Sequence, residues 1–410
     1  MISKMPRILH LSFDGVLQPL GYAQVLRPTL KLAARGFEYE IASLERQQDL
    51  ADSERLHRVE AELAAQGVQW KFDVYDESGG GKAVLTNLVR GAQLAAASAA
   101  RGTKVLHARG YQPAAIAFAL RRMIGLPYVF DTRGFWIDER AEEGRWFNTP
   151  SRLDLARRLE ALLFHSAARV VCLAEPGARD IQDGTHTGRA PTSEVAVIPT
   201  AVDYAEFADS SSALVPSDVR DALGNSLVIG FVGSLNDSYR VDESIELFRR
   251  LRDLRPDAKL LGLTRQTDEL SSRLDRAGVR DWAVVRSVPH EHMPSWLRLI
   301  DWGLLLLKTS RAKRASMPTK LAEFFAAGIR PVQFGCNDEV SAWVRNAGTG
   351  LVLPDLSKES LARAAKKIAE GGRSEALTQQ GILATREHFD LKAAADAYAR
   401  VLGPLIASRT

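Results

Sequence analysis

The residue types best suited to chemistry gather in one block of the second half of the chain, Lys308–Gly328. The block opens with four cations, Lys308, Arg311, Lys313 and Arg314. Ser316 suits the N-cap of a following helix, and Pro318 suits its first turn. Lys320 and Glu323 are three residues apart and therefore share one face of that helix. A cation that neutralises a diphosphate, beside a carboxylate that accepts ribose hydroxyls, predicts a nucleotide-sugar site. The alternative is a solvated basic loop followed by an ordinary ion pair.

A second candidate site follows an apolar run, Val228–Leu235. The run ends in Gly233 and Ser234, and Arg240 precedes a helical stretch. Backbone N–H groups at a helix start bind anions, and a guanidinium adds a charged fork for phosphate. Arg265 is a further candidate for binding the same ligand. A plain turn is the alternative.

The first half of the chain carries a charged loop, Phe130–Arg140, directly after an apolar run. Its candidate residues are Asp131, Arg133 and Glu139. Arg109 ends the preceding apolar run, and Gly15 follows the first one, where a glycine lets the backbone approach a ligand closely. Charges and aromatic residues at the carboxyl end of a strand predict a substrate-facing loop. The alternatives are a structural ion-pair cluster and, at Gly15, an ordinary β-α turn. The dinucleotide fingerprint G-x-G-x-x-G is absent there.

These candidates follow strands in a regular alternation of short apolar runs and amphipathic stretches. The predicted strands of the first half are Arg7–Ser12, Tyr39–Ser43, Gln69–Asp73, Lys104–His107, Tyr128–Asp131, Arg169–Leu173 and Val195–Ile198. Those of the second half are Leu227–Val232, Lys259–Leu263, Trp282–Val285, Trp302–Leu307, Pro331–Phe334 and Gly350–Leu353. Strand–helix alternation predicts βαβ units and parallel sheets. The fold class is therefore α/β, with two Rossmann-like doubly wound domains facing a central cleft where ligands bind.

The alternation pauses at a polar, Ser-rich stretch that predicts a linker. We expect an N-terminal acceptor-binding domain over 1–205, a linker over 206–225 and a C-terminal nucleotide-sugar-binding domain over 226–388. The last stretch, 389–410, reads as a helix with no strand after it.

Composition excludes several classes of protein. Lys and Arg exceed Asp and Glu by only 54 to 50, so no nucleic-acid footprint is expected. Two cysteines argue against a disulfide framework, and no spacing suggests a metal site. No apolar run approaches the length of a membrane span. These patterns predict a cytoplasmic protein, with peripheral contact to the inner face of a membrane left open.

Five blocks of the sequence carry a resemblance to a known family. They are Leu32–Glu40, Val197–Asp203 with Phe207, Gly230–Leu235, Ser316–Val332 and Leu391–Leu405. The chain resembles the family-4 retaining glycosyltransferases (glycosyl transferase group 1), which have the GT-B fold. The resemblance implies that the last block is a terminal helix that crosses back to the first domain.

The resemblance also implies roles for single residues. Glu323 matches the glutamate that holds the ribose, whereas the family's other donor-block glutamate falls at Ala315. The diphosphate clamp of the family falls near Ser234 and Arg240, and its arginine is missing here; Arg311, Arg314 or Lys320 would compensate. The donor-binding candidates are Gly233, Ser234, Arg240, Arg265, Ser316, Pro318, Thr319, Lys320 and Glu323. Arg133 stands where the family has a histidine close to the donor sugar.

The sequence thus predicts a metal-independent hexosyltransferase that retains the anomeric configuration. Its donor would be a UDP- or GDP-sugar, its acceptor a glycan, a lipid-linked molecule or a small molecule, and no cofactor is implied. Arg133 and Lys320 are the predicted catalytic residues, and Gly15, Arg109, Asp131 and Glu139 the predicted acceptor residues. Polysaccharide or glycoconjugate biosynthesis is the expected setting. A catalytically silent partner subunit of the same fold and a sugar-nucleotide epimerase remain as alternatives.

Overall fold

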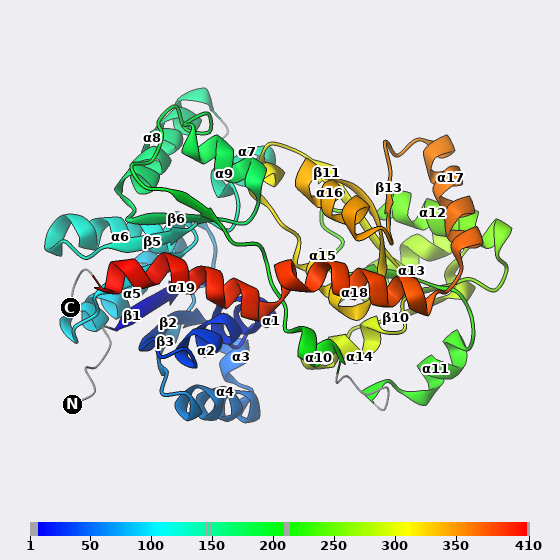
Figure 1. Cartoon of the computed structure of the whole chain (residues 1–410), viewed down its shortest axis with the longest axis horizontal. Helices are drawn as coiled ribbons and strands as arrows, with labels where there is room; N and C mark the ends of the chain where they lie inside the picture. Colours follow the sequence, from blue (N-terminus) through cyan, green and yellow to red (C-terminus); the bar gives the residue numbers. More distant parts are fainter. Residues whose placement is uncertain (1–6, 145, 148, 209–213, 408–410) are drawn as a thin grey trace. The chain divides into compact units, whose positions relative to one another are not determined.

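The computed structural model describes residues 7–144, 146–147, 149–208 and 214–407. They form two compact units (Figure 1). Unit 1 comprises Met1–Thr200, Arg311–Ser316 and Leu391–Thr410, and unit 2 comprises Ala201–Ser310 and Met317–Asp390. The predicted α/β class with two parallel sheets is confirmed.

Within the described residues, unit 1 is built on a seven-stranded sheet with the order β3-β2-β1-β4-β5-β6-β7. Its strands are β1 (Ile8–Ser12), β2 (Tyr39–Glu45), β3 (Gln69–Val74), β4 (Val105–Arg109), β5 (Tyr128–Asp131), β6 (Arg169–Cys172) and β7 (Val195–Val197). Neighbouring strands pair in parallel, as between Ile8 and Val105. Every residue of β1, β2, β4 and β5 is buried, because helices cover both faces of the sheet.

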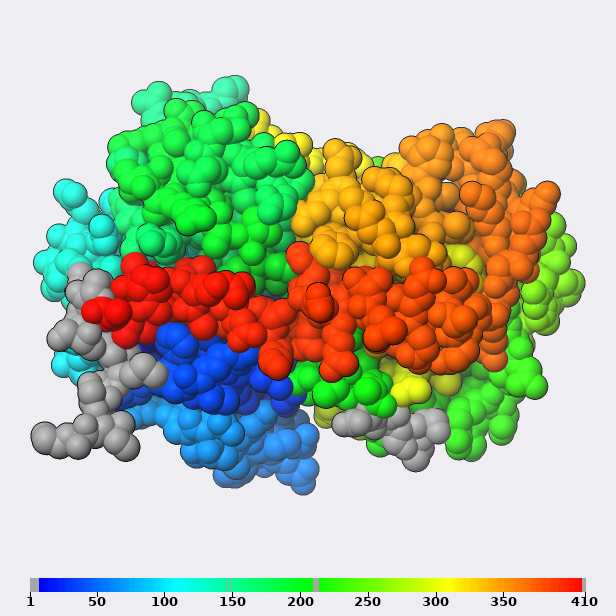
Figure 2. Space-filling model, in the orientation of Figure 1, coloured from blue at the N-terminus to red at the C-terminus, as the bar shows by residue number. Residues whose placement is uncertain are grey.

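The helices of unit 1 connect these strands. They are α1 (Pro19–Gly21), α2 (Arg27–Ala33), α3 (Gln47–Leu50), α4 (Ser53–Ala65), α5 (Gly80–Ala100), α6 (Tyr111–Ile124), α7 (Trp136–Glu142), α8 (Pro150–Ser166), α9 (Glu175–Gln182) and α19 (Leu391–Ala407). A π-helical turn, Tyr22–Leu26, precedes α2, where Pro28 lacks the N–H that a regular helix would use. Helix α19 packs beside α2, and Figure 2 shows it in red at the molecular surface.

The part of unit 2 that the structure describes contains a six-stranded parallel sheet with the order β10-β9-β8-β11-β12-β13. Its strands are β8 (Val228–Val232), β9 (Lys259–Leu263), β10 (Ala283–Arg286), β11 (Trp302–Thr309), β12 (Arg330–Cys336) and β13 (Leu351–Val352). Its helices are α10 (Tyr204–Ala208), α11 (Ser217–Leu223), α12 (Val241–Leu254), α13 (Thr267–Arg276), α14 (Met293–Leu297), α15 (Thr319–Ala327), α16 (Asp338–Ala347), α17 (Lys358–Gly371) and α18 (Glu375–Phe389). Apolar residues of β8, β9, β11 and α12 form its core.

Both sheets reverse their strand order at one place, between β1 and β4 and between β8 and β11. Ligands of doubly wound sheets bind beyond the carboxyl ends of the strands at this point. Ligand-binding residues are therefore expected in the loops that follow β1, β4, β8 and β11.

Two segments from the second half of the sequence belong to unit 1. Arg311–Ser316, which lies between β11 and α15, belongs to unit 1, and so does the segment from Leu391 onward. The expected linker, 206–225, contains the end of α10 and all of α11, both in unit 2. Residues 209–213 of that linker lie outside the described part of the chain.

Candidate functional site

The turn after β8 is where two of the predicted donor residues meet. Gly233 has φ +111°, a conformation that L side chains rarely adopt. A Cβ added to Gly233 would lie 2.0 Å from Nζ of Lys320, so the lysine side chain lies directly over the turn. The ammonium of Lys320 is also 3.7 Å from the centroid of the Tyr239 ring. The structure therefore places the Lys320 ammonium at the carboxyl end of β8.

The start of α15 lies at the same edge of the sheet. The helix begins at Thr319, and Pro318 occupies its N-cap position without a side-chain hydrogen bond. The expectation that Ser316 caps this helix is wrong, because the chain is still extended at Pro318. Pro318 supplies no side-chain hydrogen bond to the first amides of α15, and the amides at a helix start bind anions.

Glu323 lies one turn after Lys320 on α15 and is half-buried. Burial raises the pKa of its carboxyl group, and the ammonium of Lys320 partly offsets this by lowering it. A carboxylate held beside an ammonium at the carboxyl edge of a sheet is a suitable acceptor for sugar hydroxyls. Lys320 and Glu323 therefore lie on α15, with the Lys320 ammonium at the carboxyl end of β8, and their binding of a nucleotide stays a prediction.

Arg240, Ser234 and Arg265 occupy the loops that follow β8 and β9. Arg240 is the N-cap residue of α12, and its Nε is a buried atom with no hydrogen-bond partner in the described part of the chain. Ser234 follows Gly233 and is exposed, and Arg265 is exposed two residues beyond β9. The structure places all three at the carboxyl edge of the second sheet. It records no contact that joins Arg265 to Lys320.

The cations of the basic loop are engaged within unit 1. Arg311 Nη2 donates to the carbonyl oxygen of His186 at 3.0 Å, Lys313 Nζ is 3.4 Å from Glu139, and Arg314 Nη2 donates to Asp180 at 2.8 Å. The backbone N–H of Ala312 donates to Glu142 at 3.1 Å. Arg311 and Arg314, expected to compensate for the missing clamp arginine, thus hold carboxylates and a carbonyl of unit 1.

Ala315 and Ser316 end this loop and also pack in unit 1. Ala315 is fully buried among the core residues of that unit. A Cβ added to Gly177, on α9, would lie 2.4 Å from Cα of Ala315, so the two backbones are in close contact. There is no room here for a carboxylate side chain, which explains the alanine. Oγ of Ser316 lies 3.6 Å from where a Cβ of Gly134 would stand, beside the charged loop after β5.

Gly15 has a structural role in the turn after β1. A Cβ at this position would lie 2.4 Å from Oε2 of the buried Glu45. The Glu45 carboxylate accepts hydrogen bonds from the backbone N–H of Val16 at 2.8 Å and of Leu17 at 3.1 Å. Burial raises the pKa of Glu45, and the hydroxyl of Ser43 and these amides oppose the shift. The close approach of Gly15 is therefore to Glu45, a residue that the sequence analysis missed.

A buried charge network joins the ends of β4 and β5. Arg109 Nε donates to Asp14 at 3.0 Å. Asp131 accepts from the hydroxyl of Tyr398 at 2.8 Å and is 3.7 Å from Nη1 of Arg133. Burial alone would raise the pKa of Asp131, but the guanidinium of Arg133, with His107 and Arg109, holds it below its usual range. The carboxylate is therefore ionised at all ordinary pH values.

Arg133 adopts φ +58°, a conformation that is uncommon for any residue except glycine. Its Nη2 donates to the side-chain oxygen of Gln24 at 3.2 Å, and Gln24 belongs to the π-helical turn before α2. Burial would lower the pKa of Arg133, yet Asp131 raises it above the ordinary value. The guanidinium is permanently charged and held on two sides.

A cavity of about 440 Å³ lies above this network in unit 1. Among its lining residues are Arg109, Arg133, Glu139, Asp14 and Trp136. The structure thus brings together three of the predicted site residues of the first half, whereas Asp131 lies beneath and Gly15 is not among the lining residues. Tyr398 and Gln24 were not predicted, because nothing in their local sequence distinguishes them from residues of an amphipathic helix.

One protein-family model matches part of the chain. Residues 23–201 match the model of the glycosyl transferase 4-like domain, so this segment, which is less than half of the chain, is similar to such domains. No curated protein sequence matches the chain.

Solved structures extend the likeness to the whole chain. Sucrose-phosphate synthase from Thermosynechococcus elongatus superposes with a TM-score of 0.70 at 13% identity, over 98% of this chain and 100% of that one. Alr3699/HepE from Anabaena, in complex with UDP-glucose, gives a TM-score of 0.69 at 13% identity, over 97% of this chain and 99% of that one. The α,α-trehalose 6-phosphate synthase from Burkholderia multivorans gives 0.68 at 16% identity, over 100% of both chains. The chain therefore has the GT-B fold of these structures, and the segment that matches the glycosyl transferase 4-like model lies in its first half.

The described residues contain no group of three or more His, Cys, Asp or Glu side chains arranged to hold a metal ion. Among the same residues, no helix has both the length and the apolar character needed to cross a bilayer.

Proposed function

We propose that the chain transfers a sugar from a nucleotide-sugar to an acceptor. The observation that carries this proposal is the position of Lys320, whose ammonium covers the Gly233 turn at the carboxyl end of β8 and lies at the start of α15. This is the point of a doubly wound sheet at which phosphates bind. The match to the glycosyl transferase 4-like model and the UDP-glucose held by Anabaena HepE support the same assignment.

The donor would bind through unit 2. Lys320 and the unpartnered Nε of Arg240 would neutralise the diphosphate, and Glu323 would accept hydrogen bonds from the ribose hydroxyls. Because HepE binds UDP and UDP-glucose, we propose a UDP-sugar rather than a GDP-sugar. Cations that balance the diphosphate make a divalent metal unnecessary, so the proposed reaction is metal-independent.

The acceptor would bind in the cavity of unit 1. Transfer breaks the bond between the anomeric carbon and the diphosphate and forms a bond to an acceptor oxygen. In a retaining reaction on one face of the sugar, the leaving phosphate takes the acceptor proton, so no enzymic base is required. Catalysis then consists of positioning and of stabilising the leaving diphosphate. The Arg133 guanidinium, which stays charged because Asp131 raises its pKa, would hold sugar hydroxyls.

One observation favours a second candidate, a catalytically silent partner subunit. Ala315 carries no carboxylate, and its contact with Gly177 leaves no space for one, so the donor sugar lacks the contact that the resemblance implies. A silent subunit would fold and associate without turning over a donor.

Calorimetric titration with UDP and UDP-glucose, together with an assay of UDP release, tests both candidates. The proposed transferase binds UDP and releases it slowly from UDP-glucose by hydrolysis, because water can replace the acceptor. Lys320→Ala should weaken UDP binding by about 10- to 100-fold and slow UDP release, in a protein that still melts cooperatively. Folded wild-type protein that binds no nucleotide would overturn the proposal and favour the silent subunit.

A further inference from the structure

Unit 1 carries an apolar groove next to its polar cavity. The groove has a volume of about 630 Å³, which lies within the range of small-molecule sites. Helix α8 supplies one wall, and α5, α6 and α7 supply the others. The apolar lining residues are Leu88, Ala115, Ile137, Phe147, Leu155, Ala156, Leu159 and Leu163, with Tyr111, Trp136 and Trp146.

The leucines of α8 are unusually exposed for their type. Leu155 is 59% exposed and Leu159 is 55% exposed, and both line the groove. They are four residues apart and therefore lie on the same face of the helix. On the neighbouring α5, Leu85 is 63% exposed. Contiguous exposed apolar side chains mark a binding surface, whereas scattered ones do not.

The groove and the polar cavity share a wall. Tyr111, Trp136 and Trp146 line both of them. The rings of Trp136 and Trp146 meet edge to face, with centroids 6.0 Å apart, and Tyr111 lies 5.8 Å from Trp136. A molecule with a polar end in the cavity can therefore pass an apolar end over these rings into the groove.

The charges of the cavity indicate the nature of that polar end. Arg109 is paired with Asp14, Arg133 is paired with Asp131, and Glu139 is paired with Lys313. Because the guanidinium charges are balanced, the cavity does not attract an anion. It presents many hydrogen-bond donors and acceptors, which suits a neutral, hydroxyl-rich group.

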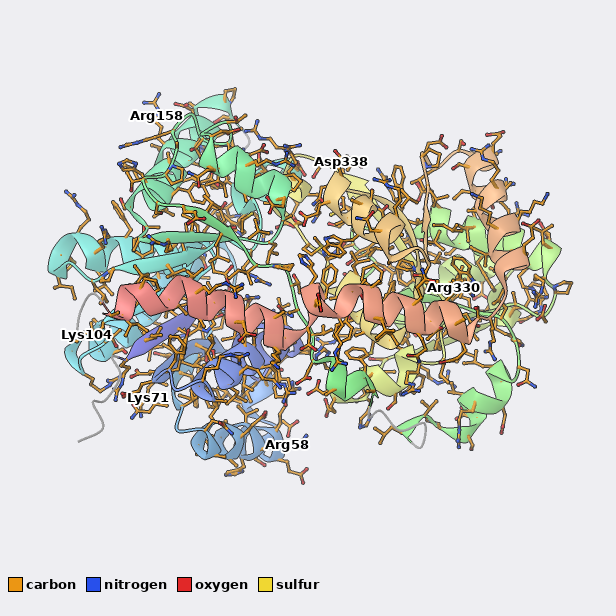
Figure 3. All side chains as sticks on the ribbon, viewed as in Figure 1. Arg58, Lys71, Lys104, Arg158, Arg330 and Asp338 are labelled. Atoms are coloured by element: carbon orange, nitrogen blue, oxygen red, sulfur yellow. The ribbon has the colours of Figure 1, made fainter. Side chains whose placement is uncertain are left out.

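Among the described residues, the lining of the groove holds one cation, Arg152, and one carboxylate, Glu160, so it has no excess of positive charge, which argues against an anionic membrane surface as its occupant. Arg158, which Figure 3 labels on α8, is 2.8 Å from Asp154, so its charge is balanced. A surface that binds anionic lipid headgroups needs an excess of cations beside its apolar face. The groove is in addition concave and ends at the polar cavity.

We propose that the acceptor is a neutral amphiphile, with a hydroxylated head in the cavity and a hydrocarbon chain in the groove along α8. The role of this amphiphile as acceptor rests on the proposed function, whereas its binding to unit 1 does not. Each buried methylene is worth about 0.8 kcal/mol, or about fourfold in affinity. If four of the seven additional methylenes of an octyl chain are buried, octyl glucoside should bind at least about 100-fold more tightly than methyl glucoside.

Titration with methyl and octyl β-D-glucoside, followed by calorimetry below the micelle concentration of the octyl compound, tests this proposal. The critical variant is Leu159→Glu, which places a charge in the groove at an exposed position and therefore leaves the fold intact. The matched control is Leu383→Glu, on α18 of unit 2, where the leucine is 71% exposed. Leu159→Glu should remove most of the difference between the two glucosides, and Leu383→Glu should leave it unchanged.

Glu139→Gln completes the design, because it should weaken both glucosides by the same factor. Equal binding of methyl and octyl glucoside to the wild type would overturn the proposal. So would a chain-length effect that survives Leu159→Glu, or flotation with neutral phosphatidylcholine vesicles in place of one-to-one binding. UDP titrated into the same samples reports on unit 2 separately. If the wild-type protein binds octyl glucoside but not UDP, the proposed function is refuted and the amphiphile site is not.

Discussion

Gly233→Ala is the substitution that tests the donor site most directly. The new Cβ would stand 2.0 Å from Nζ and 2.4 Å from Cε of Lys320, so the lysine must leave its place over the turn. Its cation–π contact with Tyr239, worth about 0.5–1 kcal/mol at exposed sites, would be lost. The positive φ adds about 1–2 kcal/mol of backbone strain for any L residue. We therefore expect a loss of about 1.5–3 kcal/mol in the free energy of unfolding, the sum of these contributions.

The effect on ligand binding follows from the displaced ammonium. A charge-assisted hydrogen bond to a diphosphate is worth about 1.5–3 kcal/mol, so UDP affinity should fall by about 10- to 100-fold. Calorimetric titration of UDP into the purified variant measures this, and thermal unfolding reports the stability. Gly278→Ala is the control that has the backbone strain without the clash. Gly278 has φ +69°, and a Cβ added to it would meet nothing within 4 Å.

Gly278→Ala should thus lower stability without changing UDP affinity. A second check uses the Lys320→Ala background, in which Gly233→Ala should cost no further affinity, because the two changes act through the same atoms. The reasoning is refuted if Gly233→Ala binds UDP as the wild type does, or if the two substitutions prove additive.

Other outcomes follow from the same two sites. Glu323→Gln should weaken UDP binding about 10- to 100-fold. Because burial raises the pKa of Glu323, the folded protein disfavours its charged form. Stability is therefore lost as pH rises through that pKa, and Glu323→Gln should raise the melting temperature more at pH 7 than at pH 4. A larger gain at pH 4 would contradict this. Lys320→Ala should weaken UDP far more than uridine; equal losses would show that Lys320 does not hold the diphosphate. Arg133→Ala, and less severely Arg133→Lys, should lower turnover while UDP affinity stays unchanged, and normal turnover per folded molecule would make Arg133 a structural partner of Asp131. Tyr398→Phe should destabilise the protein by about 1–3 kcal/mol by leaving the buried Asp131 carboxylate without its hydroxyl donor, which chemical denaturation can measure.

The sheets, and the closeness of Gly233 to Lys320, were accessible from sequence because they depend on local patterns and on strand order. The strand runs, such as Val228–Val232 and Tyr128–Asp131, are short, apolar and separated by amphipathic stretches, so the period of the pattern predicts the sheets. Gly233 and Lys320 follow strands that lie side by side, and neighbouring parallel strands end at the same edge. Their proximity was therefore predictable from topology.

The remaining features depend on contacts between residues distant in sequence. Tyr398 reaches Asp131 across 267 positions, and no local pattern marks either as the other's partner. The basic loop 311–316 looked like a phosphate site because its carboxylate partners, such as Asp180, lie in another segment. Gly15 suggested a ligand because the sequence does not show that Glu45 fills the space beside it. Spacing predicts shared faces, but it does not predict which charge a cation will meet.

The division of the chain between the units has a consequence for biosynthesis. Unit 1 is assembled from residues up to Thr200, from Arg311–Ser316 and from α19, so translation must pass α19 before this unit can close. Before these later segments are made, Gly177 lacks its contact with Ala315, and the Asp131 carboxylate has Arg133 beside it but lacks the hydroxyl of Tyr398. Domains usually fold in the order of their synthesis, beginning with the N-terminal one. Here the unit that begins first is completed last, and a fragment that ends at Thr200 would expose the apolar surface that Ala315 and α19 cover in the whole chain.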